Sequence, residues 1–359
     1  LNNNLSGLHV HYSSALITNC QFSGNNYGLS SGGLFTWDGQ YDSLIVNHST
    51  IAGNVTGGLG MAFGGSAYIF NSIIADNNNQ NVSFHNNDVP NEVRFGHSLI
   101  EGGESTVITN DNGTVDYSIG ENYFDENAGF KNVDEGDYTL TDTSPAIGRA
   151  NNLISYNNRD YISPDHDING LSRPNPSGTI ADLGAYESSR GIDPNYSGPV
   201  WYVDGPANLP YGNGGPGAPY STIMEGISVA EDGDTVFVSE GNYTENIDFG
   251  GKDIVVMGEN QETTVIDGSQ SGSVAIFQNG ETKEAVLESF TIMNGSNTNG
   301  GGIFITTASP TLRNLIISQN SANAGGGISI DNQCNVVMTN LIVRINSATE
   351  RGGGVFTWG

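Results

Sequence analysis

Three stretches toward the C-terminal end of the chain repeat one pattern, and this repetition decides the fold. They read LESFTIMNGSNTNGGGIFI (287–305), LRNLIISQNSANAGGGISI (312–330) and MTNLIVRINSATERGGGVFT (338–357). In each stretch, a short apolar run leads through polar residues to three glycines and a second short run. A near-constant period of this size is typical of repeat proteins, in which each unit buries its apolar face against its neighbours.

The N-terminal third carries the same unit more loosely. A four-residue submotif ending in Asn recurs in both regions, at Asn25, Asn54, Asn77, Asn320 and Asn346. Short strands stacked at the usual spacing of about 4.8 Å would place these residues at one corner, where their side chains hydrogen-bond along the axis. The glycine triplets mark a second corner where only Gly fits. We predict an all-β, right-handed parallel β-helix; a β-sandwich, the alternative, would not repeat a motif at constant offset.

The composition agrees with this fold class and excludes others. The 359 residues include 50 Gly, 11 Lys plus Arg and 39 Asp plus Glu, for a formal net charge of −28. Gly and Asn are poor helix formers, so a helical protein is excluded. A chain this acidic repels nucleic acid and anionic membrane surfaces, and it has no apolar stretch long enough for membrane insertion. The charge favours cations such as Ca²⁺ and neutral glycans as partners.

The repeat breaks between residues 98 and 187, which are rich in Asp, Asn and Tyr. Three motifs occur there in order: TSPAI (143–147), DHDINGLSRP (165–174) and ADLGAYE (181–187). This region resembles the closing region of bacterial surface β-helix proteins of the choice-of-anchor Q type. The resemblance implies that residues 1–97 are the last coils of a first β-helix, which residues 98–187 close.

A second β-helix is expected after a linker at residues 188–199. The segment PYSTIMEGISVA (219–230) predicts a short amphipathic helix near residues 221–230, with Ile223, Ile227 and Ala230 on one face. The run from residue 200 resembles the opening of pectate-lyase-like β-helix proteins, where such a helix caps the first coil and covers its strand edges. Residues 200–359 are therefore interpreted as the cap and first coils of a second β-helix.

Leu1 and Gly359 both fall in mid-coil, which predicts neighbours at each end. Either the coils continue in a longer tandem chain, or copies of the chain stack end to end. Joining Gly359 to Leu1 places Gly354 only about half a repeat before Gly7. This register is poor, so the longer chain is favoured.

The catalytic motifs of pectate-lyase-like enzymes can be compared with this sequence. Pectin hydrolases carry Asp-Asp, Gly-His-Gly and Arg-Ile-Lys, whereas here Gly96-His97 precedes Ser, Arg344-Ile345 precedes Asn, and no Asp-Asp pair exists. No acid and base pair for glycoside hydrolysis is therefore predicted, and no catalytic residue is assigned. Arg313 and Arg344, candidates for a lyase base, have different offsets in consecutive units and are not expected to stack.

One segment carries a candidate calcium site. DHDING (165–170) supplies oxygens at positions 1, 3 and 5 of a calcium loop and Gly at position 6. Position 12 is Pro176 instead of Glu, so a ligand from elsewhere must complete the shell. The predicted ligands are Asp165, Asp167, Asn169 and Asp182, with Glu187 as an alternative to Asp182. Chelating Ca²⁺ is then expected to lower the melting temperature by several degrees.

Several weaker candidates remain. A second cation cluster is conceivable at Asp125, Glu126, Asp134, Glu135 and Asp137, and two imidazoles share a strand face at His9 and His11. Sugar-stacking aromatic residues would be Trp37, Tyr41, Trp201 and Trp358, although covering coil edges is the simpler interpretation. Glycosylation sequons occur at Asn4, Asn47, Asn54, Asn81, Asn112, Asn195, Asn242 and Asn294. The two cysteines, Cys20 and Cys334, are interpreted as free thiols.

Three functional classes follow from these patterns. The favoured one is a non-catalytic structural or adhesive element of an extracellular bacterial surface protein, fibre or sheath. A carbohydrate-binding module and a polysaccharide lyase or glycoside hydrolase are the alternatives. Stacked carboxylates with a base would indicate an enzyme, and coplanar exposed aromatic rings would indicate a binding module.

Overall fold

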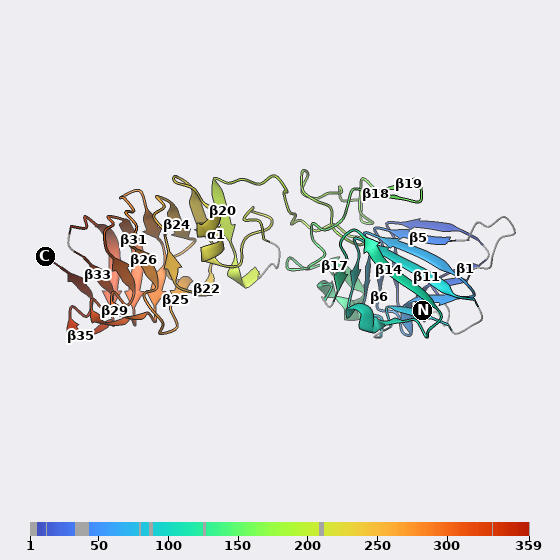
Figure 1. Ribbon diagram of the computed structural model, residues 1–359, viewed down its shortest axis with the longest axis horizontal. Helices are drawn as coiled ribbons and strands as arrows, with labels where there is room; N and C mark the ends of the chain where they lie inside the picture. The colour runs from blue at the N-terminus through green and yellow to red at the C-terminus, as the bar shows by residue number, and fades with distance from the viewer. Residues whose placement is uncertain are drawn as a thin grey trace. The chain divides into compact units, whose positions relative to one another are not determined.

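The chain divides into two compact units, Leu1–Pro194 and Asn195–Gly359. The computed structural model (Figure 1) describes residues 6–11, 13–32, 43–78, 80–85, 89–124, 127–207, 212–331 and 333–358. The division between the units falls inside the stretch 188–199, which the sequence marks as a linker.

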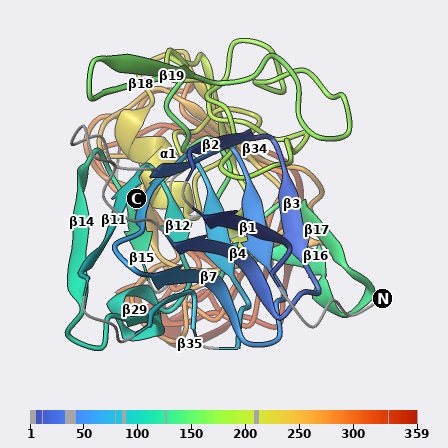
Figure 2. The same ribbon diagram turned by 90° about the vertical axis from the view of Figure 1, so that its right-hand side faces the viewer.

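The first unit contains a parallel β-helix of three five-stranded sheets, in which each coil gives one strand to each sheet (Figure 2). The first sheet contains β1 (Leu8–His11), β4 (Tyr27–Gly32), β7 (Gly57–Ala62), β10 (Val82–Phe84) and β13 (Val107–Ile108). The second contains β2 (Ala15–Thr18), β5 (Ser43–Asn47), β8 (Ser66–Phe70), β11 (Asn91–Gly96) and β14 (Gly113–Ile119). The third contains β3 (Gln21–Ser23), β6 (Thr50–Ala52), β9 (Ile73–Ala75), β12 (Leu99–Ile100) and β15 (Tyr123–Phe124).

The coils of the first unit continue to Phe124, beyond the expected boundary at residue 97. In the last coil, Asn122 takes the corner role that Ser98 has one coil earlier. The 3₁₀ helix η1 (Gly103–Thr106) lies within this coil, and η2 (Val133–Glu135) follows it. Two antiparallel hairpins complete the unit: β16 (Phe130–Asn132) with β17 (Asp137–Leu140), and β18 (Leu153–Tyr156) with β19 (Arg159–Ile162).

The second unit is also a parallel β-helix. Its nine-stranded sheet contains β20 (Val200–Val203), β21 (Thr235–Val238), β22 (Gly241–Thr244), β24 (Val255–Gly258), β25 (Thr264–Asp267), β27 (Val286–Glu288), β28 (Thr291–Met293), β31 (Thr311–Ser318) and β34 (Val337–Arg344). A five-stranded sheet contains β23 (Ile247–Asp248), β26 (Ala275–Phe277), β30 (Ile303–Ile305), β33 (Ile328–Ile330) and β36 (Val355–Thr357). A third contains β29 (Ser296–Asn299), β32 (Ser321–Ala324) and β35 (Ser347–Arg351), and the 3₁₀ helix η3 spans Gly205–Ala207.

The predicted capping helix is present as α1 (Ile223–Val229). Thr222 and Glu225 form a capping box, in which each side chain accepts from the other residue's backbone N–H. Ile223 and Ile227 are buried against the first coils, as the periodicity predicts. Among the described residues, no helix has the length and apolar character needed to cross a membrane.

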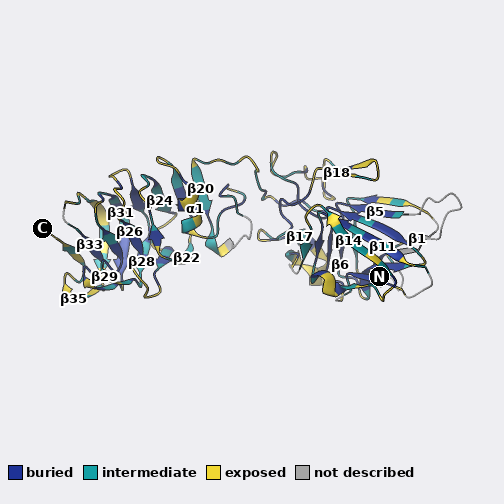
Figure 3. Cartoon of the chain, viewed as in Figure 1, coloured by how far each residue is buried: buried dark blue, intermediate teal, exposed yellow. Residues whose placement is uncertain are grey.

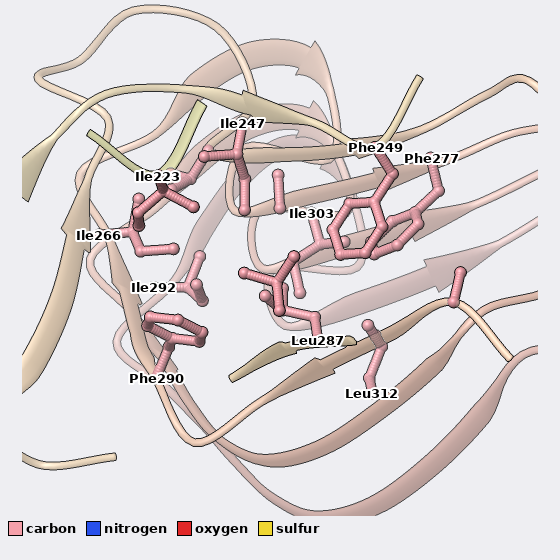
Figure 4. Close-up of a cluster of buried hydrophobic side chains, with 14 of the residues drawn as sticks. Ile223, Ile247, Phe249, Ile266, Phe277, Leu287, Phe290, Ile292, Ile303 and Leu312 are labelled. Atoms are coloured by element: carbon pink, nitrogen blue, oxygen red, sulfur yellow. The ribbon is translucent and has the colours of Figure 1, made fainter. Parts of the chain in front are cut away.

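The register of the second unit confirms the sequence repeat. Leu312 of β31 pairs with Leu287 on one side and with Met338 on the other. Equivalent inward positions therefore stack from coil to coil, and the core between them is apolar (Figure 4). Phe249 and Phe277 continue this stack, with ring centroids 4.3 Å apart.

The predicted asparagine ladder is confirmed in both units. In the first, Nδ2 of Asn54 donates to Oδ1 of Asn77 (2.9 Å) and Nδ2 of Asn25 donates to Oδ1 of Asn54 (3.3 Å). In the second, Nδ2 of Asn320 donates to Oδ1 of Asn346 (3.0 Å). Each amide also binds backbone groups, so the ladder satisfies the corner while linking coils along the axis.

The glycine corner is confirmed as well. Gly325 has φ +63°, which favours a residue without Cβ. A Cβ on Gly326 would lie 2.1 Å from the Ser347 carbonyl oxygen, and one on Gly327 would lie 2.5 Å from the Gly354 carbonyl oxygen. At Gly326 and Gly327, the next coil therefore approaches too closely for any side chain.

Candidate functional site

A row of polar residues lines one corner of the first unit, between its second and third sheets. Four residues occupy equivalent positions in four successive coils: Asn19 (φ 59°), His48 (43°), Asn71 (47°) and His97 (49°). These left-handed values suit Asn and His better than β-branched residues. We call these four residues the corner row.

A second ladder fixes the corner row from behind. The Ser49 hydroxyl accepts from the backbone N–H of Cys20 (3.1 Å), and the Ser72 hydroxyl accepts from that of Ser49 (3.1 Å). Ser98 and Asn122 extend the series by one coil each. Because these small side chains bind the corner backbone, the neighbouring corner-row side chains are free to engage other parts of the chain.

Residues 148–187, which we call the strap, lie along the corner row and bind its members one by one. The contacts are Asn19 Nδ2 to the His166 carbonyl (3.1 Å), His48 Nε2 with Ser163 Oγ (2.7 Å), Asn71 Nδ2 to the Asn151 carbonyl (3.0 Å) and His97 Nε2 with Asn151 Nδ2 (3.3 Å). The strap therefore ties four coils together along the side of the β-helix.

The β18–β19 hairpin of the strap covers an apolar outward face of the second sheet. Ile45 and Phe70 point away from the coil interior, yet both are buried, because Ile154 and Tyr161 pack over them. The ring centroids of Phe70 and Tyr161 are 5.1 Å apart. This hairpin therefore adds a second layer to part of the sheet.

A buried ionic cluster anchors the strap to the corner row. Nε of Arg173 lies 3.1 Å from Oε1 of Glu187, and neither side chain is exposed to solvent. Nη1 of Arg173 donates to the Gly184 carbonyl (3.1 Å) and to Nδ1 of His48. Since arginine only donates, Nδ1 of His48 must be unprotonated, which leaves its Nε2–H to donate to Ser163. Burial and, secondarily, Arg173 hold the pKa of His48 well below its usual value.

Two aspartates of the cluster are held by backbone N–H groups. Oδ1 of Asp167 accepts from Asn169 and Leu171 (both 2.8 Å). The two carboxylate oxygens of Asp182 accept from Gly148 (2.8 Å) and Ser188 (2.7 Å).

Burial raises the pKa of two carboxyls in the cluster. The pKa of Asp182 rises to about 7 and that of Glu187 to about 8, in the latter case also because Asp182 is close. One arginine cannot neutralise three neighbouring carboxylates, so a shared proton near neutral pH is the physical expectation.

The structure brings some of the predicted calcium ligands together and separates others from the cluster. Asp167 and Asp182 are both buried beside Arg173, and the backbone N–H of Glu187 donates to Oδ2 of Asp167 (3.1 Å). Asp165 and Asn169 are exposed. Within the described ranges, no group of three or more His, Cys, Asp or Glu is placed to hold a metal ion. Calcium binding here stays a prediction.

An acidic pocket lies on another side of the first unit. Asp76 and Glu101, one coil apart, line a cavity of about 290 Å³ together with Asn77, Asn81 and Thr106. Burial raises the pKa of both carboxyls, and their mutual proximity adds to the rise for Glu101. No sequence pattern predicts this pair, because the two residues occupy different positions in their repeats.

The other candidates have simple placements. Trp201 donates from Nε1 to Oδ2 of Asp234 (2.9 Å) in the cap of the second unit. Five other candidates lie outside the described residues: Trp37, Tyr41, Asp125, Glu126 and the side chain of His11. Neither Cys20 nor Cys334 forms a disulfide. Arg313 pairs with Thr339 and not with Arg344, as the offsets predict. Sequon asparagines that are buried in the coils are Asn47, Asn54, Asn81 and Asn112.

The fold defines the chain as a β-solenoid protein with two parallel β-helical units and a side strap on the first. Compared with known proteins, the chain matches no family model, no curated protein and no solved structure.

Proposed function

We propose that this chain is a non-catalytic structural or adhesive β-helical element of an extracellular bacterial surface protein, fibre or sheath. The observation that carries the proposal is the bracing of the first unit in two directions. Asparagine and serine ladders link its coils along the axis, and the strap links four coils from the side. A rod braced in this way suits a protein that resists mechanical load.

The order of parts supports a tandem arrangement within this proposal. The first unit carries its strap after its coils, and the second begins with a helix-capped coil. The proposed partners are neighbouring β-helical units of the same chain or copies stacked end to end, and the proposed surface ligands are glycans. Sedimentation velocity on the purified chain separates stacking copies, which associate as concentration rises, from a chain that stays monomeric.

The location is tested by immunoelectron microscopy of the source cells. Antibodies raised against the purified chain should label the surface of intact cells. Label confined to the interior of sectioned cells would contradict the extracellular assignment. A glycan array probed with the same chain tests the carbohydrate-binding alternative, and it is expected to show no specific binding.

The predicted calcium ion belongs to this proposal as a ligand of the strap. Asp167 and Asp182 are the buried oxygen donors that would contribute to it. A ligand bound only by the folded state raises the melting temperature, so chelation is expected to lower it by several degrees. An unchanged melting temperature after chelation removes the calcium assignment.

A second candidate function is glycoside hydrolysis at the Asp76 and Glu101 pocket. Hydrolases of sugars use two carboxyls, one of which has a raised pKa so that it can act as an acid. Release of reducing sugar from neutral polysaccharides, abolished by Glu101→Gln and unaffected by Glu92→Gln, would favour this function over the structural one.

A further inference from the structure

The second unit has an apolar sheet face that points away from its core. Five half-buried residues on β20, β21 and β24 form this face (Figure 3). They are Val200, Tyr202, Phe237, Val255 and Met257. Residues that alternate with them, such as Val236 and Val256, are fully buried in the core. None of the five belongs to the core cluster of the unit. We call these five residues the β20 face.

The β20 face is continuous across neighbouring strands. Tyr202 pairs with Phe237, and Phe237 pairs with Met257, so the three side chains form one outward column. The rings of Tyr202 and Phe237 meet edge to face, with centroids 5.9 Å apart. Outward side chains on a solvent-exposed strand face are ordinarily polar, so such a column indicates a covered surface.

The first unit shows what covers a face of this composition. Its outward column runs Ile45, Tyr68, Arg94 and Asp116, from apolar residues to an ion pair in which Nη1 of Arg94 lies 3.1 Å from Oδ2 of Asp116. Tyr156 of the β18–β19 hairpin lies over this column, 5.2 Å from the Tyr68 ring and 5.6 Å from the Arg94 guanidinium.

The column of the second unit also passes from apolar side chains to an ion pair, with its carboxylate before its arginine. After Tyr202, Phe237 and Met257 come Glu288 and Arg313, which form an ion pair between adjacent strands. Both columns thus offer two or three apolar side chains followed by an ion pair between an arginine and a carboxylate. In the first unit, this arrangement receives aromatic and aliphatic side chains from one face of a two-stranded hairpin.

We propose that the β20 face is a docking surface for a β-hairpin of another polypeptide, with Ile and Tyr alternating on its buried side. The apolar column receives the Ile and Tyr side chains, and a Tyr ring of the hairpin lies against the Arg313 guanidinium. Aromatic contacts and a cation over a ring each add to the affinity that apolar burial supplies.

The probe for this test is a cyclised peptide with the sequence of residues 152–163, which carries Ile154, Tyr156 and Tyr161. It is titrated into the full chain labelled with ¹³C at the methionine methyl groups. The Met257 signal should shift saturably, because an aromatic ring approaches it. A peptide in which both tyrosines are replaced by serine should leave the signal in place.

Substitutions in the full chain test whether the peptide binds at the β20 face. Phe237→Ser and Met257→Lys should each weaken peptide binding by about tenfold or more, as expected for central contacts of an interface. Thr339→Lys, on the polar end of the same column, is the matched control and should bind as the unsubstituted chain does. Met257→Lys places its change on the outside of the coil, so it tests the proposal even if Phe237→Ser fails to fold.

Three results would overturn the proposal. The Met257 signal could stay fixed at millimolar peptide, or it could move equally with the serine peptide. The chain could also self-associate in sedimentation velocity through a contact that Met257→Lys abolishes and the peptide does not displace, which would make a second copy the occupant.

Discussion

Asn54 shows how one side chain holds a corner of the first β-helix. Its Oδ1 accepts from the backbone N–H of Asn25 (3.0 Å), and its Nδ2 donates to the carbonyl of Phe22 (3.0 Å) and to Asn77. The side chain is 2% exposed. Water therefore cannot replace these bonds when the amide is removed.

Asn54→Ala is predicted to destabilise the first unit by about 2–4 kcal/mol, since each buried partner left unpaired costs about 1–3 kcal/mol. Urea unfolding of the full chain measures this loss. Asn152→Ala, at an exposed position of the same unit, is the control and should change stability by less than about 0.5 kcal/mol.

Gly327 and Gly354 occupy the same corner position in successive coils and form a matched pair. A Cβ on Gly327 would lie 2.5 Å from a carbonyl oxygen, whereas one on Gly354 would lie 3.4 Å from Cγ1 of Val343. Gly327→Ala should therefore cost about 1–3 kcal/mol and Gly354→Ala much less. Equal melting temperatures for the two variants would show that the corner is not packed as described.

The Asp182 and Glu187 carboxyls predict a pH dependence of the first unit. Their pKa values of about 7 and about 8 in the folded chain exceed the values near 4 of an unfolded chain. The folded state thus holds protons that the unfolded state has released, so stability falls as pH rises through 7 and 8. Burial lowers the pKa of His48, which works the other way and reduces stability below pH 6.5.

Urea unfolding should accordingly show the first unit about 2–4 kcal/mol less stable at pH 9 than at pH 6. Glu187→Gln should remove much of this difference, and Glu121→Gln, at an exposed position, should leave it intact. A stability that rises steadily from pH 6 to pH 9 would contradict the assigned protonation.

For single residues, the sequence predicts the interactions that recur from coil to coil and misses the interactions that occur only once. The Asn ladder and the glycine corner could be predicted because their residues recur at constant offset. The cluster of Arg173, Glu187 and His48 could not, because His48 lies 125 residues from Arg173 and belongs to the coils, not to the strap. The loop motif predicts Asp167 as a calcium ligand, and Asp182 is predicted only as a ligand from elsewhere in the chain. The structure gives both carboxylates backbone N–H partners.

Among the elements, the hairpin β18–β19 makes the strap more than an irregular loop. Tyr161 and Ile154 are buried against the second sheet, and this contact fixes the hairpin on the coils. The sequence predicted the coils, their register and helix α1, since all of these follow periodic patterns. It did not predict the hairpin or the coil that ends at Phe124, because neither carries a repeat.

Tyr161→Ala is predicted to release the hairpin without unfolding the coils beneath it. Removing a buried aromatic side chain costs about 3–5 kcal/mol, part of which is lost locally. Hydrogen exchange should accelerate by about 100-fold or more in the amides that pair β18 with β19, while those of β5 and β8 stay protected. Arg159→Ala, exposed on the same hairpin, should leave both sets unchanged.

The whole molecule consists of two β-helical units, of which the first is braced by the strap. The units comprise 194 and 165 residues, so their unfolding steps differ in length and can be told apart when the chain is stretched. Bracing by the strap should therefore affect only the longer unfolding step, which belongs to the first unit, and the shorter step of the second unit serves as an internal control.

The most direct test is single-molecule force measurement on the full chain and its Arg173→Met variant. Replacing Arg173 removes the one cation beside the buried carboxyls of Asp167, Asp182 and Glu187, together with its hydrogen bonds to Gly184 and His48. Breaking such a buried network costs about 3–5 kcal/mol. The account predicts that the longer step occurs at clearly lower force in the variant, that Arg173→Lys is intermediate, and that the shorter step is unchanged. A longer step at the same force in all three proteins would contradict the claim that the strap braces the first unit.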